Sequence, residues 1–256
     1  IVVIILFSSL IKLLILYLQF IKKFNVNLDL KFDYLLVLSL IKESTPLAIA
    51  SAAALLYTKI DQIMIGAMLG VYEVGVYSIS NKMIMVVAIA IGPVQISIFP
   101  KMLDWYNNNK ELYYTRYQFI TSIITWFYII GTICSFLVLP YLFNSIFSKD
   151  YLKSLDVFYI LVLSTFFMYN ATLRSSHFTI TGNSKILMIS QIFAVFINII
   201  LNYFMIPKFG VFGAAYATVI TQFISLFLSN LFFKEGREIF WLQLKGINPM
   251  NIIKMR

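Results

Sequence analysis

Seven long apolar stretches, separated by short polar segments, occupy almost the whole chain of 256 residues. The hydrocarbon core of a bilayer is about 30 Å thick, so a helix that spans it needs about 20 apolar residues. Each stretch reaches that length. Hydrophobic residues make up 61% of the chain and charged residues only 12%, which excludes an ordinary water-soluble domain. The sequence therefore predicts an all-α, polytopic bundle of seven membrane helices, over residues 1–20, 46–70, 74–100, 117–140, 157–181, 186–206 and 211–233.

The polar segments divide this bundle into parts. Ser44 and Thr45 precede Pro46, an order typical of a helix start, where a hydroxyl group caps the first turn and proline loses no hydrogen bond. Residues 21–45 mix charged, amide and apolar side chains, so they are interpreted as a linker on the cytoplasmic membrane surface. Residues 234–256 have the same mixed character and are interpreted as an interfacial tail on the cytoplasmic side.

A glycine and a proline interrupt the third stretch. Pro93 follows Gly92 about two-thirds of the way along it. Proline removes one hydrogen bond of the helix and clashes with the preceding turn, so a kink is expected here. The kink is interpreted either as a static bend or as a hinge between two conformations.

The net charge of +9 follows the predicted topology. If the chain alternates across the membrane from a cytoplasmic end of the first stretch, thirteen basic residues fall in inner segments and three in outer ones. This bias is the positive-inside pattern of membrane proteins and accounts for most of the charge without nucleic acid as a partner. The inner residues are Lys22, Lys23, Lys31, Lys42, Lys101, Lys110, Arg116, Lys185, Lys234, Arg237, Lys245, Lys254 and Arg256, and the outer ones are Lys149, Lys153 and Lys208.

Five ionisable side chains inside the predicted helices are candidates for function: Lys59, Asp61, Lys82, Arg174 and His177. A charge at the centre of a bilayer costs about 2.5–3.5 kcal/mol even on lenient scales, so such groups face water or one another. The simpler alternative is that each of them reaches out to the lipid headgroups.

The hairpin around Val71 and Tyr72 brings an acid and a base to similar depth. Asp61 precedes the turn and Lys82 follows it by about ten residues each, which places both about 15 Å from the turn. We therefore predict that Asp61 and Lys82 interact, either as a structural pair or as a gate.

Several kinds of site have no counterpart in the sequence. One histidine and one cysteine, Cys134, cannot form a zinc site or an internal disulfide. The glycine-rich loops of nucleotide-binding proteins and the nucleophile motifs of hydrolases are also missing. The sequence predicts no cofactor and no enzyme activity.

Two segments carry a resemblance to a known family. The first runs from Lys59 through Asp61-Gln-Ile-Met-Ile-Gly-Ala-Met-Leu-Gly70 to Asn81-Lys82, and the second contains Asn198-Ile-Ile-Leu-Asn202, Ile206-Pro207 and Gly213-Ala-Ala-Tyr-Ala-Thr218. Together they resemble polysaccharide flippases of the Wzx type, in the multidrug/oligosaccharidyl-lipid/polysaccharide exporter superfamily. That family folds as two six-helix lobes around a central cavity. On this pattern, residues 1–20 resemble the last helix of a truncated first lobe, and residues 46–233 resemble the second lobe.

The resemblance implies a function. Such proteins move a lipid-linked oligosaccharide, carried on undecaprenyl pyrophosphate, across the bacterial inner membrane for O-antigen, lipopolysaccharide or capsule synthesis. The expected partners are this lipid, the bilayer, a coupling proton or sodium ion, and other membrane proteins of polysaccharide assembly. Asp61 and Lys82 are the expected gate or coupling residues, and Gly92 and Pro93 the expected hinge. The expected substrate cavity contains Lys59, Lys82, Arg174, His177, Asn81, Tyr77, Asn198 and Asn202.

Three other functions remain open at this point. A cation-coupled drug antiporter of the same superfamily would need an acidic cavity, whereas this chain keeps more bases than acids in its helices. A membrane-embedded glycan polymerase or acyltransferase usually carries its catalytic groups on a large polar loop, and residues 141–156 contain neither His nor Arg. A purely structural membrane protein would have no use for intramembrane charges.

Overall fold

The computed structural model describes residues 2–24, 33–89, 91–146 and 151–248. Every regular element in these ranges is a helix, which confirms the all-α prediction. The chain divides into two compact units, Ile1–Glu43 and Ser44–Arg256. The helices are α1 (Val2–Phe24), α2 (Tyr34–Leu69), α3 (Val71–Ala88), α4 (Ile91–Asn108), α5 (Lys110–Ile146), α6 (Leu152–Ile180), α7 (Ser184–Phe209), α8 (Val211–Gln222) and α9 (Lys234–Lys245), with η2 (Phe223–Phe227) and η3 (Leu228–Phe232) continuing α8.

Several helices are long and apolar enough to cross a membrane. Five of the described helices qualify, and a sixth span is added if the bent pair α3 and α4 counts as one. The protein is therefore a multi-pass membrane protein. The count of seven stays a prediction, because the first expected span coincides with α1, which is not among these five or six. The five are Tyr34–Leu69, Lys110–Phe143, Leu152–Ile180, Ser184–Phe209 and Val211–Phe232.

The expected kink in the third stretch is present as a break between two helices. α3 ends at Ala88, α4 begins at Ile91, and the two helices are bent by 41°. Pro93 lies in the first turn of α4, where its missing N–H would have no helical partner. The break is explained by this proline, and the role of Gly92 and Pro93 as a moving hinge stays a prediction.

The predicted helix start at Pro46 is wrong. α2 begins at Tyr34 and runs through Pro46 without a break. The residue that caps it is Asp33, whose Oδ1 accepts a hydrogen bond of 3.1 Å from the backbone N–H of Leu36. A proline inside a helix removes one hydrogen bond, and a helix of 36 residues retains enough of the others to continue. Much of the expected linker is therefore helical, although residues 25–32 lie outside the described residues.

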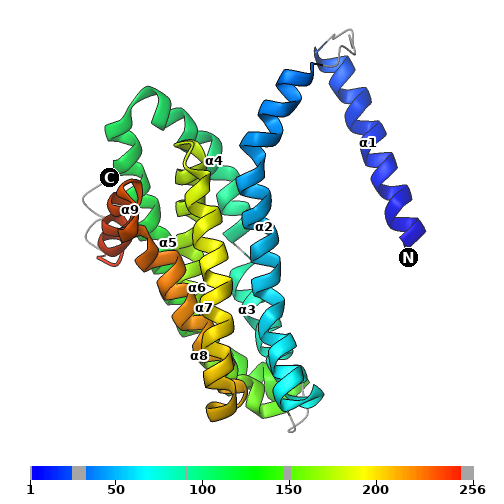
Figure 1. The fold of residues 1–256 in the computed structure, drawn as a ribbon, viewed down its shortest axis with the longest axis vertical. Coiled ribbons are helices and arrows are strands. Elements are labelled where there is room, and N and C mark those ends of the chain that lie inside the picture. The colour runs from blue at the N-terminus through cyan, green and yellow to red at the C-terminus, as the bar shows by residue number, and fades with distance from the viewer. Residues whose placement is uncertain (1, 25–32, 90, 147–150, 249–256) are drawn as a thin grey trace. The chain divides into compact units, whose positions relative to one another are not determined.

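Three glycines in a left-handed conformation connect the helices of the larger unit. Gly70 (φ 96°) separates α2 from α3, Gly182 (φ 72°) lies between α6 and α7, and Gly210 (φ 61°) separates α7 from α8. Only glycine adopts such angles without strain. The predicted last turn at 207–210 is shorter than expected, because α7 continues through Pro207 to Phe209. The turns at Gly182 and Gly210 place α7 beside both α6 and α8 (Figure 1).

The larger unit, Ser44–Arg256, has two main apolar clusters. One joins α3, α6 and α8 through side chains such as Val76, Phe158 and Ala214. The other joins α4, α5, α6 and α9 and includes Met102 and Ile239. α9 therefore packs on the bundle through Ile239. The interpretation of 234–256 as a cytoplasmic interfacial tail stays a prediction, and residues 249–256 lie outside the described part. Polar side chains are also buried in this unit, and some of them form the candidate site.

Candidate functional site

Asp61 is an acidic side chain buried inside the larger unit. Ala53, Asp61 and Ile65 are the buried residues of α2 and recur at intervals of eight and four, so they share one helix face. Only 4% of Asp61 is exposed. The spacing of α2 therefore directs a carboxylate into the bundle, where an unsatisfied charge would be strongly destabilising.

Three neutral side chains from three other helices donate hydrogen bonds to this carboxylate. Nδ2 of Asn202, on α7, lies 2.6 Å from Oδ1 of Asp61. The hydroxyl groups of Tyr77, on α3, and Thr218, on α8, lie 2.7 and 2.8 Å from Oδ2. Nδ2 of Asn202 also contacts Oδ1 of Asn198 at 3.0 Å. Asp61 thus joins four helices in a polar site that we call the Asp61 site, made of Asp61, Tyr77, Asn198, Asn202 and Thr218.

The Asp61 site has unused hydrogen-bonding capacity. Oδ1 of Asn202 and Nδ2 of Asn198 are buried without a partner. A half-turn of the Asn202 amide would aim its oxygen at the Asp61 carboxylate, and the oxygen and nitrogen of an asparagine side chain are similar enough in shape to exchange places. Carboxylate, amide and hydroxyl oxygens are ligands of hard cations. The site is therefore suited to a proton or a small hard cation, and no cluster for a transition metal occurs in the described residues.

The predicted pair between Asp61 and Lys82 is not formed. Lys82 is exposed, and the described contacts of Asp61 are all with neutral groups. The two residues do lie at similar distance from the turn. Their contact also depends on the direction in which each side chain points around its helix, which depth does not determine. Lys82 is five positions after Tyr77, which turns it about 140° around the helix, away from the face that Tyr77 buries.

The other residues of the expected cavity separate into groups. Tyr77, Asn198 and Asn202 come together at the Asp61 site rather than on an open surface. Lys59, like Lys82, is exposed, and Asn81 is half-buried. The remaining two, Arg174 and His177, are buried elsewhere in the same unit.

Arg174 is held by neutral partners between α6, α7 and η3. Its Nε donates to Oδ1 of Asn230 at 2.5 Å, and its Nη2 donates to the hydroxyl groups of Ser190 at 2.7 Å and Ser229 at 3.3 Å. The guanidinium also lies 5.0 Å from the ring centre of Phe178, a cation–π distance. With 2% exposure it does not line an open cavity in this structure.

His177 lies one turn further along α6, among aromatic rings. Its Nδ1 is 2.8 Å from the hydroxyl group of Tyr113, and the rings of Tyr113, Tyr114 and Tyr117 surround it with centroids 5.9 to 6.4 Å away. Only 3% of the side chain is exposed. His177 is thus a buried partner of Tyr113 and is not accessible to a substrate headgroup.

Several residues of these sites were not recognised from the sequence. Thr218 was part of the resembling segment but was not identified as a ligand of Asp61. Asn230 and Gln243 were also missed, although Nδ2 of Asn230 donates to Oε1 of Gln243 at 3.1 Å and so connects α9 to Arg174. The available signal was the recurrence of polar residues every three or four positions along the last span.

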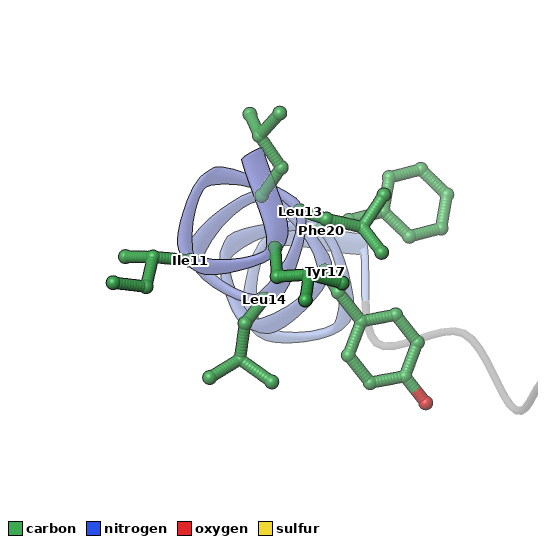
Figure 2. A pocket seen from close by; sticks show the side chains of 7 residues that line it. Ile11, Leu13, Leu14, Tyr17 and Phe20 are labelled. Carbon is green, nitrogen blue, oxygen red and sulfur yellow. The ribbon is translucent and has the colours of Figure 1, made fainter. Parts of the chain in front are cut away.

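A shallow apolar surface also exists on α1. It is lined by Leu10, Ile11, Leu13, Leu14, Leu16, Tyr17 and Phe20. Figure 2 shows Ile11, Leu14 and Tyr17 pointing away from the helix in different directions. These are outward-facing side chains of one helix with no convergent polar groups, so the surface has no feature of a substrate site.

Comparisons with known proteins give one family match near the start of the chain and two relatives that match most of its length. Residues 1–105 match the family described as "Polysaccharide biosynthesis protein". The chain is 23% identical to the capsular polysaccharide biosynthesis protein CapF of Staphylococcus aureus, over 83% of the chain and 52% of that protein. It is 28% identical to an uncharacterized membrane protein of Methanocaldococcus jannaschii, over 76% of the chain and 45% of that protein. No solved structure matches. The chain spans about half the length of these two relatives. It is thus similar to a polysaccharide biosynthesis family, to one capsular polysaccharide biosynthesis protein and to one membrane protein.

Proposed function

We propose that this chain is part of a transporter that flips an undecaprenyl-pyrophosphate-linked oligosaccharide from the inner to the outer leaflet of the bacterial inner membrane, for surface polysaccharide synthesis. The similarity to CapF and to the polysaccharide biosynthesis family supports a membrane role in polysaccharide assembly. The resemblance to Wzx-type flippases supports translocation rather than catalysis. Alternating access would move this lobe against its counterpart.

The single observation that carries a transport mechanism is the buried carboxylate of Asp61. It is held by neutral donors from α3, α7 and α8, and none of its hydrogen bonds in the described part of the chain comes from a base. Binding of a proton or a sodium ion would remove this unfavourable charge and change which hydrogen bonds Tyr77, Asn202 and Thr218 form. Because these residues lie on different helices, cation binding would alter the packing of the lobe. Asp61 is thus the proposed coupling residue.

The exposed lysines are the proposed contacts for the anionic headgroup. Lys59 on α2 and Lys82 on α3 both point away from the buried faces of their helices. A lysine at membrane depth is expected to face water, an anion or a headgroup rather than lipid tails. A pyrophosphate provides such an anion, whereas the buried Arg174 and His177 are not accessible to it.

The test is to replace Asp61 by asparagine in a strain that depends on the full-length protein. Asn keeps the shape and removes the charge. We expect normal abundance in the membrane, loss of surface polysaccharide and accumulation of the lipid-linked oligosaccharide in the inner leaflet. The matched control is Asp104→Asn, an exposed acid on α4. Full export by Asp61→Asn would refute the coupling role. Accumulation of unpolymerised glycan already in the outer leaflet would instead indicate a polymerase.

A further inference from the structure

A row of buried polar residues runs along the last membrane span, on one side of it. The positions recur at intervals of one, three or four residues along α8, η2 and η3, so they keep largely to one side of the span. All of them are less than a tenth exposed. We call this row the polar seam, and its members are Thr218, Thr221, Gln222, Ser225, Ser229 and Asn230.

The polar seam joins two buried charges of opposite sign. At one end Thr218 donates to Asp61, and at the other Ser229 and Asn230 accept from Arg174. Eleven or twelve residues separate these ends, which corresponds to about 17 Å along a helix. The seam therefore connects the proposed cation site with the end of the bundle where α9 docks.

Between the two charges the polar seam has unpaired polar atoms. Oγ1 of Thr221 and Oε1 of Gln222 are buried without a partner. Such atoms are normally satisfied by buried water. The span also changes here from α-helix to the π-helical turn Phe223–Phe227, an irregularity often found at functional positions of helices. The seam therefore has the hydrogen-bonding capacity to hold water, which a dry apolar core lacks.

Arg174 is a buried basic side chain at the end of the polar seam. Its hydrogen-bond partners Asn230, Ser190 and Ser229 are neutral, and no acidic side chain in the described residues pairs with it. Burying an unpaired charge costs free energy, so a neutral side chain would make a purely structural link at lower cost. The charge itself is the property that distinguishes Arg174 from such a link, and a fixed positive charge repels cations.

We propose that Arg174 is an electrostatic barrier that prevents cations from passing along the polar seam between Asp61 and the α9 end of the bundle. A coupling site must communicate with one side of the membrane at a time, because a hydrated route to both sides would dissipate the ion gradient. Arg174 closes the route at one end through charge, while the neutral partners hold the guanidinium without cancelling it. This role rests on the proposed binding of a cation at Asp61.

The first test measures passive leak of protons or sodium ions through the full-length protein in liposomes, without any glycolipid. Arg174→Gln keeps hydrogen-bonding groups and removes the charge, so it should raise the leak at least about tenfold. Arg174→Lys keeps the charge, so its leak should equal that of the wild type. The control Lys185→Gln removes an exposed charge at the start of α7, and its leak should equal that of the wild type. Adding Asp61→Asn to Arg174→Gln should lower the leak again. If a folded Arg174→Gln protein leaks no more than the wild type, the proposal that Arg174 is a barrier is wrong.

A second measurement does not depend on the stability of Arg174→Gln. Ser225→Cys, in a Cys134→Ser background, places a thiol in the polar seam, and Ile220→Cys places one on an exposed face of the same span. Anionic methanethiosulfonate reagents should label position 225 faster than cationic ones, and position 220 should show no such preference. Absence of labelling at 225, or equal rates for both charges, overturns the proposal. Neither experiment requires glycolipid transport, so failure of the proposed flipping activity would be seen separately, in the export assay.

Discussion

Asn202 donates a hydrogen bond of 2.6 Å to Asp61 across 141 residues of sequence. The two side chains tie α2 to α7, which are separated in the chain by four other helices. Asp61 and the partners described above all lie in the larger unit, Ser44–Arg256. The contact therefore links the proposed coupling residue directly to the packing of the lobe.

Replacing Asn202 by leucine should destabilise the protein. The change keeps a similar volume but removes one of the three donors to a buried carboxylate, which we expect to cost about 1–3 kcal/mol. The midpoint of thermal unfolding in detergent should fall measurably. Tyr203→Leu is the matched control, because Tyr203 is the exposed neighbour of Asn202 on α7. Equal midpoints for Asn202→Leu and wild type would mean that the hydrogen bond contributes nothing.

Tyr77→Phe should change cation coupling. The hydroxyl group of Tyr77 is 2.7 Å from Oδ2 of Asp61, and phenylalanine keeps the ring while removing this donor. We expect the cation concentration for half-maximal transport to shift, because the charged form of Asp61 loses stabilisation relative to the cation-bound form. Tyr113→Phe is the control, since it removes a buried hydroxyl group that contacts His177 instead. A shift of the same size in both variants would indicate a general loss of stability.

Lys82 and Asp61 should behave independently. Lys82 is exposed, so Lys82→Gln should change the free energy of unfolding by no more than about 0.5 kcal/mol. If Lys82 contacts the headgroup, export should fall while abundance is maintained. The double exchange Asp61→Lys with Lys82→Asp should be no more abundant than Asp61→Lys alone, because the two side chains face different surroundings. Recovery of abundance in the double variant would show that Asp61 and Lys82 do form an ion pair, and would contradict this prediction.

The orientation predicted from the basic residues can be checked with two cysteines. Tyr72 lies near the α2–α3 turn, which is expected to face outward, and Asn108 lies at the end of α4, which is expected to face the cytoplasm. In a Cys134→Ser background, an impermeant thiol reagent applied to intact cells should label Tyr72→Cys and not Asn108→Cys. Both positions should react after the membrane is made permeable. Labelling of both in intact cells would contradict the topology.

The sequence reveals depth in the membrane better than it reveals orientation around a helix. Hydropathy predicts several membrane-spanning helices, and five or six of the described helices qualify. The resembling segments contain Asp61, Tyr77, Asn198 and Asn202, all of which meet in one site. The predicted pair of Asp61 and Lys82 is wrong because equal depth does not imply contact, and the buried positions of α3 leave Lys82 on the opposite face.

Local signals also failed where the surrounding structure outweighed them. Pro46 has the context of a helix start, yet α2 continues through it, and the effective cap is Asp33. The environment of Arg174 depends on Ser190, Asn230 and, through Asn230, Gln243, which come from three separate elements. Such a combination follows from tertiary packing and leaves no short motif that a single sequence could display.

Gly213→Ala should separate the two helices that carry Asn202 and Thr218. Gly213 lies on α8 directly against the backbone of α7, and a methyl group at this position would overlap the carbonyl oxygen of Met205. Because backbone atoms cannot move aside as a flexible side chain can, the hairpin would have to open. We expect loss of stability of at least about 1–3 kcal/mol and weaker cation coupling.

Gly131→Ala on α5 provides the matched control, because nothing lies within 4 Å of the added methyl group. Alanine is the better helix former, so this variant should be as stable as wild type or slightly more stable. The measurement is the midpoint of thermal unfolding of the purified wild type, Gly213→Ala and Gly131→Ala proteins. If Gly213→Ala unfolds at the same temperature as Gly131→Ala, the close packing of α7 on α8 is not required, and the contact between Asp61 and Asn202 does not depend on it.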